Sequence, residues 1–218
     1  MLAVEEAATR MMDHDDERLS KRVVARMEEF WIGKIDIARR QISEGVRLFF
    51  DERDPVVIHT IIASAHQVLI DIGTRKGIKS AVKNTETLRS EELQRHLKTI
   101  NYPFNFFKHA DRDADGMINI GPLKRFTSDF IMDAIVMLQQ IAGDIPIEAK
   151  VFWSWFVSKY PQEFENCSED GEIKKMQQQR LSDWDNPKIC QFLGYAEIAG
   201  EANHSLKPDG SRAGVPNS

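Results

Sequence analysis

The sequence predicts an all-α protein, a single helical bundle with a flexible C-terminal tail. Apolar residues recur at intervals of three and four along most of the chain, which is the period of an amphipathic helix. No run of alternating β-branched residues indicates a strand. The 218 residues are 42% hydrophobic, which is enough for one sizeable core. We therefore expect a flexible N-terminus over residues 1–14, the helical bundle over residues 15–199 and a disordered tail over residues 200–218.

The first three expected helices follow from apolar stripes and from the residues at their ends. A stripe from Leu19 to Trp31 predicts a helix that ends near Gly33. A second helix, from Lys34 to Asp51, carries its apolar residues on one side and charged residues largely on the other. The third, from Pro55 to Ile72, follows Asp54, a good N-cap. Because this third helix is apolar nearly all round, we expect it at the centre of the bundle.

For the middle of the chain the sequence predicts a loop followed by two short helical segments. Residues 74–84 are polar and basic, which is typical of a loop. Ser90 is a good N-cap for a shorter helix with acidic residues in its first turn. Tyr102-Pro103 is expected to interrupt this helix, because proline lacks the backbone N–H that a helix interior needs. A separate helical segment then runs from Phe104 to Ala110.

Three further helices are expected in the C-terminal half. Pro122 fits the first position of a helix that runs to about Ala142, where Gly143 stops it. The next helix begins near Ile147 and ends before Tyr160-Pro161. Asn186-Pro187 resembles another cap and first turn and begins the last helix.

Charge limits the partners of the protein. The formal net charge of -5 and the pI near 5.7 give no overall attraction for nucleic acid, so any phosphate contact has to be local. The basic run from Arg75 to Lys83 is the one place where RNA phosphates find such a local charge. The alternative for this run is an ordinary solvated loop.

Cysteine usage and the chain start bear on location. Cys167 and Cys190 lack the spacing of a disulfide scaffold, a zinc site or a redox pair, so we expect free thiols in a reducing compartment. Residues 1–17 are acidic and do not resemble a signal peptide. No window approaches the roughly 18 apolar residues of a membrane helix. We therefore expect a soluble, cytoplasmic protein without membrane contact.

An Asp-rich loop over residues 111–119 resembles the calcium-binding loop of EF-hand proteins. Alternate carboxylates and a turn glycine suit a hard cation, which needs several oxygens converging from one tight turn. Pro122 stands at the twelfth position, where that motif has a bidentate glutamate. The pattern indicates a Ca²⁺ site; the alternative is a solvated loop with Gly116 in a left-handed conformation. The candidate metal ligands are Asp111, Asp113, Asp115 and Asn119.

A segment just before this loop carries a second resemblance. The helices over residues 34–51 and 55–72, followed by Asn105-x-x-Lys108-His109, resemble the HEPN class of helical domains. The segment Asn105–Asp111, read Asn-Phe-Phe-Lys-His-Ala-Asp, is also similar to one found in uncharacterised bacterial proteins. The HEPN resemblance implies a homodimer. It also implies metal-independent ribonuclease chemistry, in which an arginine precedes the catalytic histidine by four to six residues.

The resemblance implies catalytic roles for four residues. It implies that His109 is the general base and that Asn105 is its polar partner, and a histidine suits this role because its pKa lies near neutral pH. Phe104 stands where the class has its arginine, so Lys108 or Arg112 would have to supply the cation.

Other histidines offer further candidates. Arg53 and His59 have the arginine-to-histidine spacing, but on a different helix from the one that the class uses. His59 and His66 are seven residues apart and share one face of the apolar helix. They are either core histidines with satisfied hydrogen bonds or part of a metal pocket, if Glu44 or His109 faces them.

These observations predict a cytoplasmic HEPN-like binding or interaction module, a homodimer whose partner is a nucleotide, RNA or a protein. Two alternatives stay open. One is a metal-independent ribonuclease that uses His109. The other is a metal-binding protein that uses the Asp-rich loop.

Overall fold

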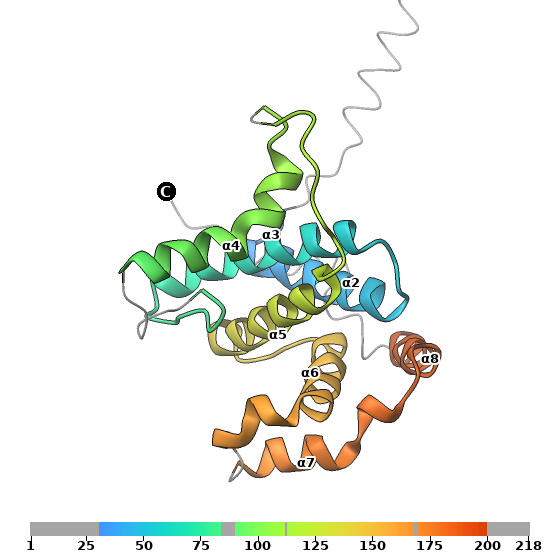
Figure 1. Cartoon of the computed structure of the whole chain (residues 1–218). Helices are drawn as coiled ribbons and strands as arrows, with labels where there is room; N and C mark the ends of the chain where they lie inside the picture. Colours follow the sequence, from blue (N-terminus) through green and yellow to red (C-terminus); the bar gives the residue numbers. More distant parts are fainter. Residues whose placement is uncertain (1–30, 84–89, 112, 168–169, 200–218) are drawn as a thin grey trace, which may run out of the picture. The chain divides into compact units, whose positions relative to one another are not determined.

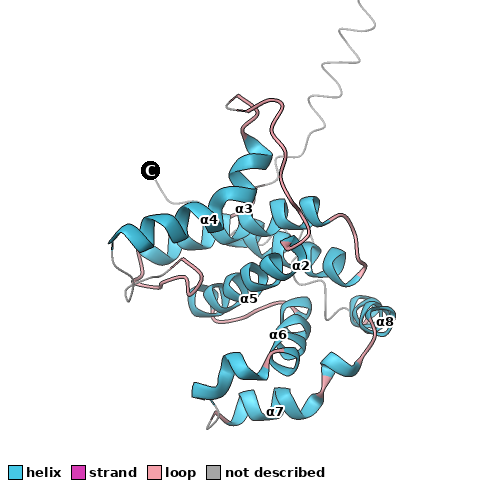
Figure 2. Ribbon diagram, in the orientation of Figure 1, coloured by secondary structure: helices cyan, strands magenta, loops and turns pink. Residues whose placement is uncertain are grey.

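The computed structural model describes residues 31–83, 90–111, 113–167 and 170–199 (Figure 1). The chain divides into two units at Gly33, and every helix described below belongs to the second unit. The described residues form helices joined by loops and contain no strand (Figure 2). The predicted all-α class is therefore confirmed. The helix expected over residues 19–33 falls almost wholly outside the described residues, as do residues 1–14 and 200–218.

Helices α2 (Lys34–Phe50) and α3 (Pro55–Thr74) form a hairpin. Both begin at the predicted residue, whereas α2 ends one residue before the predicted Asp51 and α3 ends two residues after the predicted Ile72. Asp54 caps α3 as expected, because its carboxylate accepts hydrogen bonds from the backbone N–H groups of Val56 (2.9 Å) and Val57 (3.1 Å). The two helices approach closely at Gly45, where an added Cβ would lie 2.4 Å from Cδ1 of Ile62.

The core lies where α3 packs against α2 and α5 (Leu123–Ala142), as the apolar sequence of α3 predicted (Figure 1). The expectation that no window approaches a membrane helix is wrong for α3, which is the one helix among the described residues that is long and apolar enough to cross a membrane by length and composition alone. In the structure, α3 packs between the amphipathic helices α2 and α5. The largest fully buried side chains come from these three helices and from α6 and α8, among them Phe50, Ile62, Leu69, Leu138, Phe152 and Leu193.

Helix α4 (Ser90–Lys108) corrects the prediction of two short helical pieces, because Pro103 lies inside one continuous helix. Proline at this position removes the hydrogen bond that its N–H would donate to the carbonyl of Thr99. Thr99 is exposed, so water can satisfy that carbonyl and the helix continues. The end of α4 and the segment that follows it project away from α2, α3 and α5 (Figure 1).

The C-terminal helices are α6 (Ile147–Lys159), η1 (Pro161–Cys167), α7 (Gly171–Gln179), η2 (Leu181–Asp183) and α8 (Asn186–Ile198). An ion-pair cluster joins α2, α6 and α8. Arg47 donates to buried Glu148 at 2.7 Å and 3.0 Å, and to Glu197 at 3.1 Å. A buried carboxylate is costly unless it is paired, so Arg47 is what allows Glu148 to lie in the core.

Three details of these helices differ from the prediction. Pro122 is the N-cap of α5 and not its first residue, and Asp185 caps α8 by accepting from the N–H of Lys188. Helices η1, α7 and η2 were not expected, because residues 161–183 are polar and show no clear apolar stripe. Gly143 ends α5 as predicted, with a φ of 80°.

Candidate functional site at the end of α4

The exposed side of α4 carries a row of polar and basic side chains. Starting at Arg95, exposed residues follow at intervals of three or four: Lys98, Tyr102 and Asn105, with His109 just beyond the helix end. Residues at this spacing share one face of a helix. We call these five residues the α4 face. It combines two cations, an aromatic ring that is 47% exposed, an amide and an imidazole.

The charge along this part of the chain has one sign. From Leu93 to Ala110 the sequence contains Arg95, Lys98 and Lys108 and no carboxylate. A protein of net charge -5 thus has a locally basic helix surface.

The basic loop, residues 75–83, lies beside α4. His96 on α4 forms a hydrogen bond with the backbone carbonyl of Val82 at 3.0 Å. Burial lowers the pKa of Lys83, nearby Asp71 and Asp133 oppose that shift, and the charge of Lys108 lowers the pKa further. The contact between His96 and Val82 places the basic loop against α4, so its cations add to the positive charge of this region.

A buried polar cluster holds the basic loop in place. The carboxylate of Asp133 on α5 accepts hydrogen bonds from Nε2 of His66 (2.7 Å) and from Oγ of Ser80 (2.5 Å). It also accepts from the N–H groups of Ala81 (2.9 Å) and Val82 (3.3 Å). Burial alone would raise the pKa of Asp133, but the hydrogen bonds and charge of His66 and the bonds from Ser80 and Ala81 lower it. Asp133 is thus the anchor of the basic loop.

Ser80, His66 and Asp133 are the residue types of a nucleophilic triad, but their arrangement is different. In such a triad the two ring nitrogens of the histidine face the serine and the carboxylate separately. Here the same Nε2 lies 3.3 Å from Ser80 and 2.7 Å from Asp133, and Nδ1 has no hydrogen-bond partner. All three side chains are buried, so a substrate has no access to the serine. The cluster is structural.

Three of the four residues proposed as catalytic lie among the described residues, at or just beyond the end of α4. Asn105 and Lys108 are exposed, and the ammonium of Lys108 lies 3.8 Å from the ring centre of Phe104. His109 is 43% exposed, and its Nδ1 is 3.7 Å from Asp111, too far for a hydrogen bond. Arg112 lies outside the described residues.

The described part of the Asp-rich loop forms a turn closed by its own backbone. The N–H of Gly116 donates to the carbonyl of Asp113 at 2.8 Å, and Oδ1 of Asn119 accepts from the N–H of Gly121 at 2.9 Å. Gly116 does not adopt the left-handed conformation that we expected. Asp111, Asp113 and Asp115 are exposed, and no three His, Cys, Asp or Glu side chains converge anywhere in the described parts of the chain.

His59 and His66 are core histidines, each with one hydrogen-bonded nitrogen. Nδ1 of His59 lies 3.1 Å from Oγ1 of Thr127, and its Nε2 has no partner. Burial, helped by the charge of His66, lowers the pKa of His59 to about 4, so the ring stays neutral. Arg53 is exposed and pairs with Asp51 at 2.6 Å, so the spacing between Arg53 and His59 does not bring the two side chains together.

The sequence contained the signal for the α4 face. The spacing of three and four between these residues appears only if residues 90–108 form one helix. The break expected at Pro103 assigned them to two separate segments, so the face was not predicted from the sequence. The partners of Asp133 lie 53 and 67 residues away in the chain, at Ser80 and His66, so no local pattern indicates them.

Comparison with protein-family models, with curated proteins and with solved structures found no match to this chain.

Proposed function

We propose that this protein is a cytoplasmic HEPN-like module that binds single-stranded RNA through the α4 face and the neighbouring basic loop. The observation that carries the proposal is the row of exposed residues on one side of α4, from Arg95 to His109. The HEPN resemblance of the sequence agrees with an RNA partner.

The residue types of the α4 face match the needs of a single-stranded nucleic acid. Arg95 and Lys98 are placed to contact phosphates. Tyr102 is exposed and pairs with the ring of Phe106 at 5.9 Å between centres, which offers a platform for stacking a base. Asn105 carries both a donor and an acceptor for a base edge. Arg95 and Asn105 are ten residues apart, about 15 Å along a helix, so the face suits a short stretch of strand.

Binding is a better proposal than cleavage for this surface. Phosphodiester cleavage needs a positioned base and a cation that steadies the charged transition state. Within the described residues no hydrogen bond orients the ring of His109, and Lys108 lies over Phe104. The buried His59 and His66 cannot reach a substrate. The ribonuclease remains the alternative hypothesis, and RNA cleavage in the presence of EDTA would favour it.

Fluorescence anisotropy with a labelled single-stranded oligoribonucleotide tests the proposal. Tyr102→Ala should weaken binding by about tenfold, because stacking on an aromatic ring contributes about 1–3 kcal/mol per base. Lys98→Gln should weaken binding and also reduce the slope of log K against log salt by about 0.7, because one phosphate contact is lost. The charge-matched control is Lys159→Gln, at an exposed lysine on α6.

Two results would contradict the proposal. One is the absence of RNA binding at low salt, where the electrostatic contribution is largest. The other is an equal loss of RNA affinity in Lys98→Gln and Lys159→Gln, because RNA would then bind by charge anywhere on the protein surface and not at the α4 face. A protein partner on the same face is the competing outcome.

The homodimer implied by the HEPN resemblance stays a prediction, as does calcium binding by the Asp-rich loop. Both are independent of the RNA contact, which the α4 face of one chain is able to make.

A further inference from the structure

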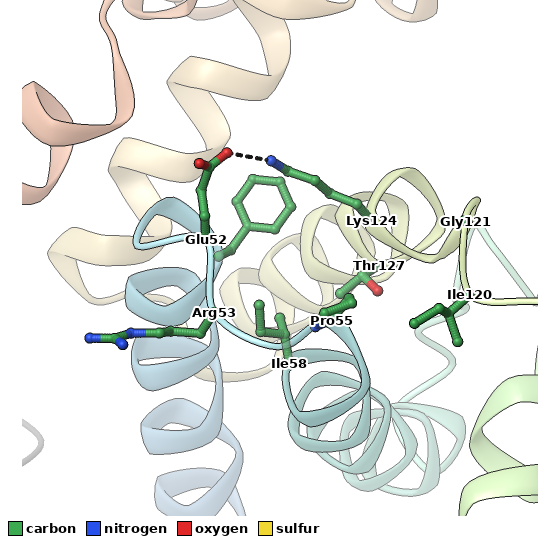
Figure 3. Close-up of a pocket in the computed structure, with 9 residues that line it drawn as sticks. Glu52, Arg53, Pro55, Ile58, Ile120, Gly121, Lys124 and Thr127 are labelled. Atoms are coloured by element: carbon green, nitrogen blue, oxygen red, sulfur yellow. Dashed lines mark hydrogen bonds and ion pairs between the residues drawn. The ribbon is translucent and has the colours of Figure 1, made fainter.

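A pocket of about 230 Å³ lies between the turn that joins α2 to α3 and the start of α5 (Figure 3). Its volume is below the roughly 300–1,000 Å³ of pockets for drug-sized ligands, so a ligand has to be small. No residue of the α4 face lines it, so a ligand here is independent of the proposed RNA contact. The apolar lining comes from Phe49, Pro55, Ile58 and Ile120.

Two charges meet at the edge of this pocket. The ammonium of Lys124 is 2.9 Å from the carboxylate of Glu52, and it lies 5.7 Å from the ring centre of Phe49 in the lining. The two charged side chains are 58% and 63% exposed. Exposed ion pairs contribute little to stability. A carboxylate on a ligand is therefore able to replace Glu52 as the partner of Lys124 at little cost.

The backbone adds positive charge on the same side. Pro122, the N-cap of α5, gives that helix no side-chain cap, whereas Asp54 caps α3. The N–H of Leu123 already donates to the carbonyl of Ile120 at 3.0 Å, so it is the positive end of the α5 dipole that reinforces Lys124, which lies in the first turn. Arg53, the other cation in the lining, pairs with Asp51 at 2.6 Å, and its side chain points away from the pocket (Figure 3).

We propose that this pocket binds a small organic monocarboxylate with a compact apolar body. The apolar body lies against Phe49, Ile58 and Ile120, and the carboxylate pairs with Lys124 in place of Glu52. The hydroxyl of Thr127 takes no part in recognition, because it already donates to the carbonyl of Leu123 at 2.7 Å.

Titration of the isotope-labelled full chain with benzoate, followed by NMR amide shifts, tests this proposal. Benzoate should bind saturably with a dissociation constant on the order of 1 mM, because so small a ligand buries few atoms. Lys124→Gln should weaken binding by roughly tenfold, because it removes a charge-assisted contact. Glu52→Gln should strengthen binding, because it removes the carboxylate that competes for Lys124. Lys159→Gln, at an exposed lysine of α6 that does not line the pocket, is the control that should change nothing.

Two ligands of similar size and opposite charge test whether the pocket prefers an anion. Benzylamine, of similar size and opposite charge, should bind at least about tenfold more weakly than benzoate, because Lys124 and the end of α5 repel it. Equal affinity for the two probes would overturn the proposal, since Glu52 or the apolar walls would then govern binding. Unchanged benzoate affinity in Lys124→Gln, or no saturable binding of benzoate at concentrations well above about 1 mM, would also overturn it.

Discussion

Asp133 shows how one buried carboxylate sets the position of a distant surface loop. Its two oxygens accept from His66, Ser80, Ala81 and Val82, which belong to α3 and to the basic loop. Because so many donors converge on it, the charged form is the stable one in the core. Asp133 thus fixes the backbone at Ala81 and Val82, and the carbonyl of Val82 contacts His96 on α4.

His59 gives a prediction on stability and pH. Its pKa is about 4 in the folded chain and 6.5 in the unfolded one. Below pH 6.5 His59 is protonated in the unfolded chain but stays neutral in the folded chain, so the folded state loses stability as the pH falls from 6.5 towards 4. Between pH 7 and about pH 5, His59 alone should lower the free energy of unfolding by about 2 kcal/mol. Urea unfolding at the two pH values measures this.

His59→Leu is the matched variant for that measurement. The substitution removes the ring that contacts Thr127, but the hydroxyl of Thr127 still donates to the carbonyl of Leu123, so no buried donor is left without an acceptor. Asp129 changes the stability in the opposite sense. Burial raises the pKa of its carboxyl to about 6, with Arg125 opposing this shift and Glu163 adding to it. The folded chain therefore binds a proton more readily at Asp129 than the unfolded chain does, which stabilises the fold as the pH falls. That effect is common to both proteins and cancels in the difference. An identical pH dependence in the two proteins would contradict the assignment.

At the scale of the helices, Gly45 lets α2 and α3 approach closely. Alanine is favoured over glycine within a helix by about 1 kcal/mol. In Gly45→Ala, however, the new Cβ would lie 2.4 Å from Cδ1 and 2.8 Å from Cγ1 of Ile62, which is fully buried. Overpacking of this kind costs about 1–3 kcal/mol, so we expect a net destabilisation of up to about 2 kcal/mol in chemical unfolding.

A double-mutant cycle checks the cause of that destabilisation. Ile62→Val removes the atom nearest to the new Cβ, so Gly45→Ala should cost less in the Ile62→Val background than in the wild type. Additive effects of the two changes would show that the contact between Gly45 and Ile62 is not responsible.

The helices could be predicted from the sequence where the signals were local, and not where packing decides. The apolar stripes and Asp54 placed α2 and α3 correctly, and Gly143 placed the end of α5. Pro103 was predicted to break the helix, because a sequence pattern does not show that Thr99, whose carbonyl loses its hydrogen-bond donor, lies on the exposed side of α4. That one error divided the α4 face between two elements and left its spacing unseen.

Over the whole molecule, charge of opposite sign lies on either side of His109. Residues 93–110 carry only cations, whereas the Asp-rich loop that follows carries carboxylates. Phosphates are attracted to the first region and repelled by the second. A bound strand should therefore run along α4 towards the basic loop and away from Asp111, Asp113 and Asp115. The net charge of -5 makes this contact weak and sensitive to salt.

The most direct test of the account is to map where RNA touches the protein. The isotope-labelled chain is titrated with a single-stranded oligoribonucleotide at low salt, and NMR amide shifts are followed residue by residue. If RNA binds to the α4 face and the basic loop, the largest amide shifts fall in residues 95–109 and 75–83, with little change on α6, α7 and α8. Shifts centred on the C-terminal helices, or no shifts at all, would contradict it.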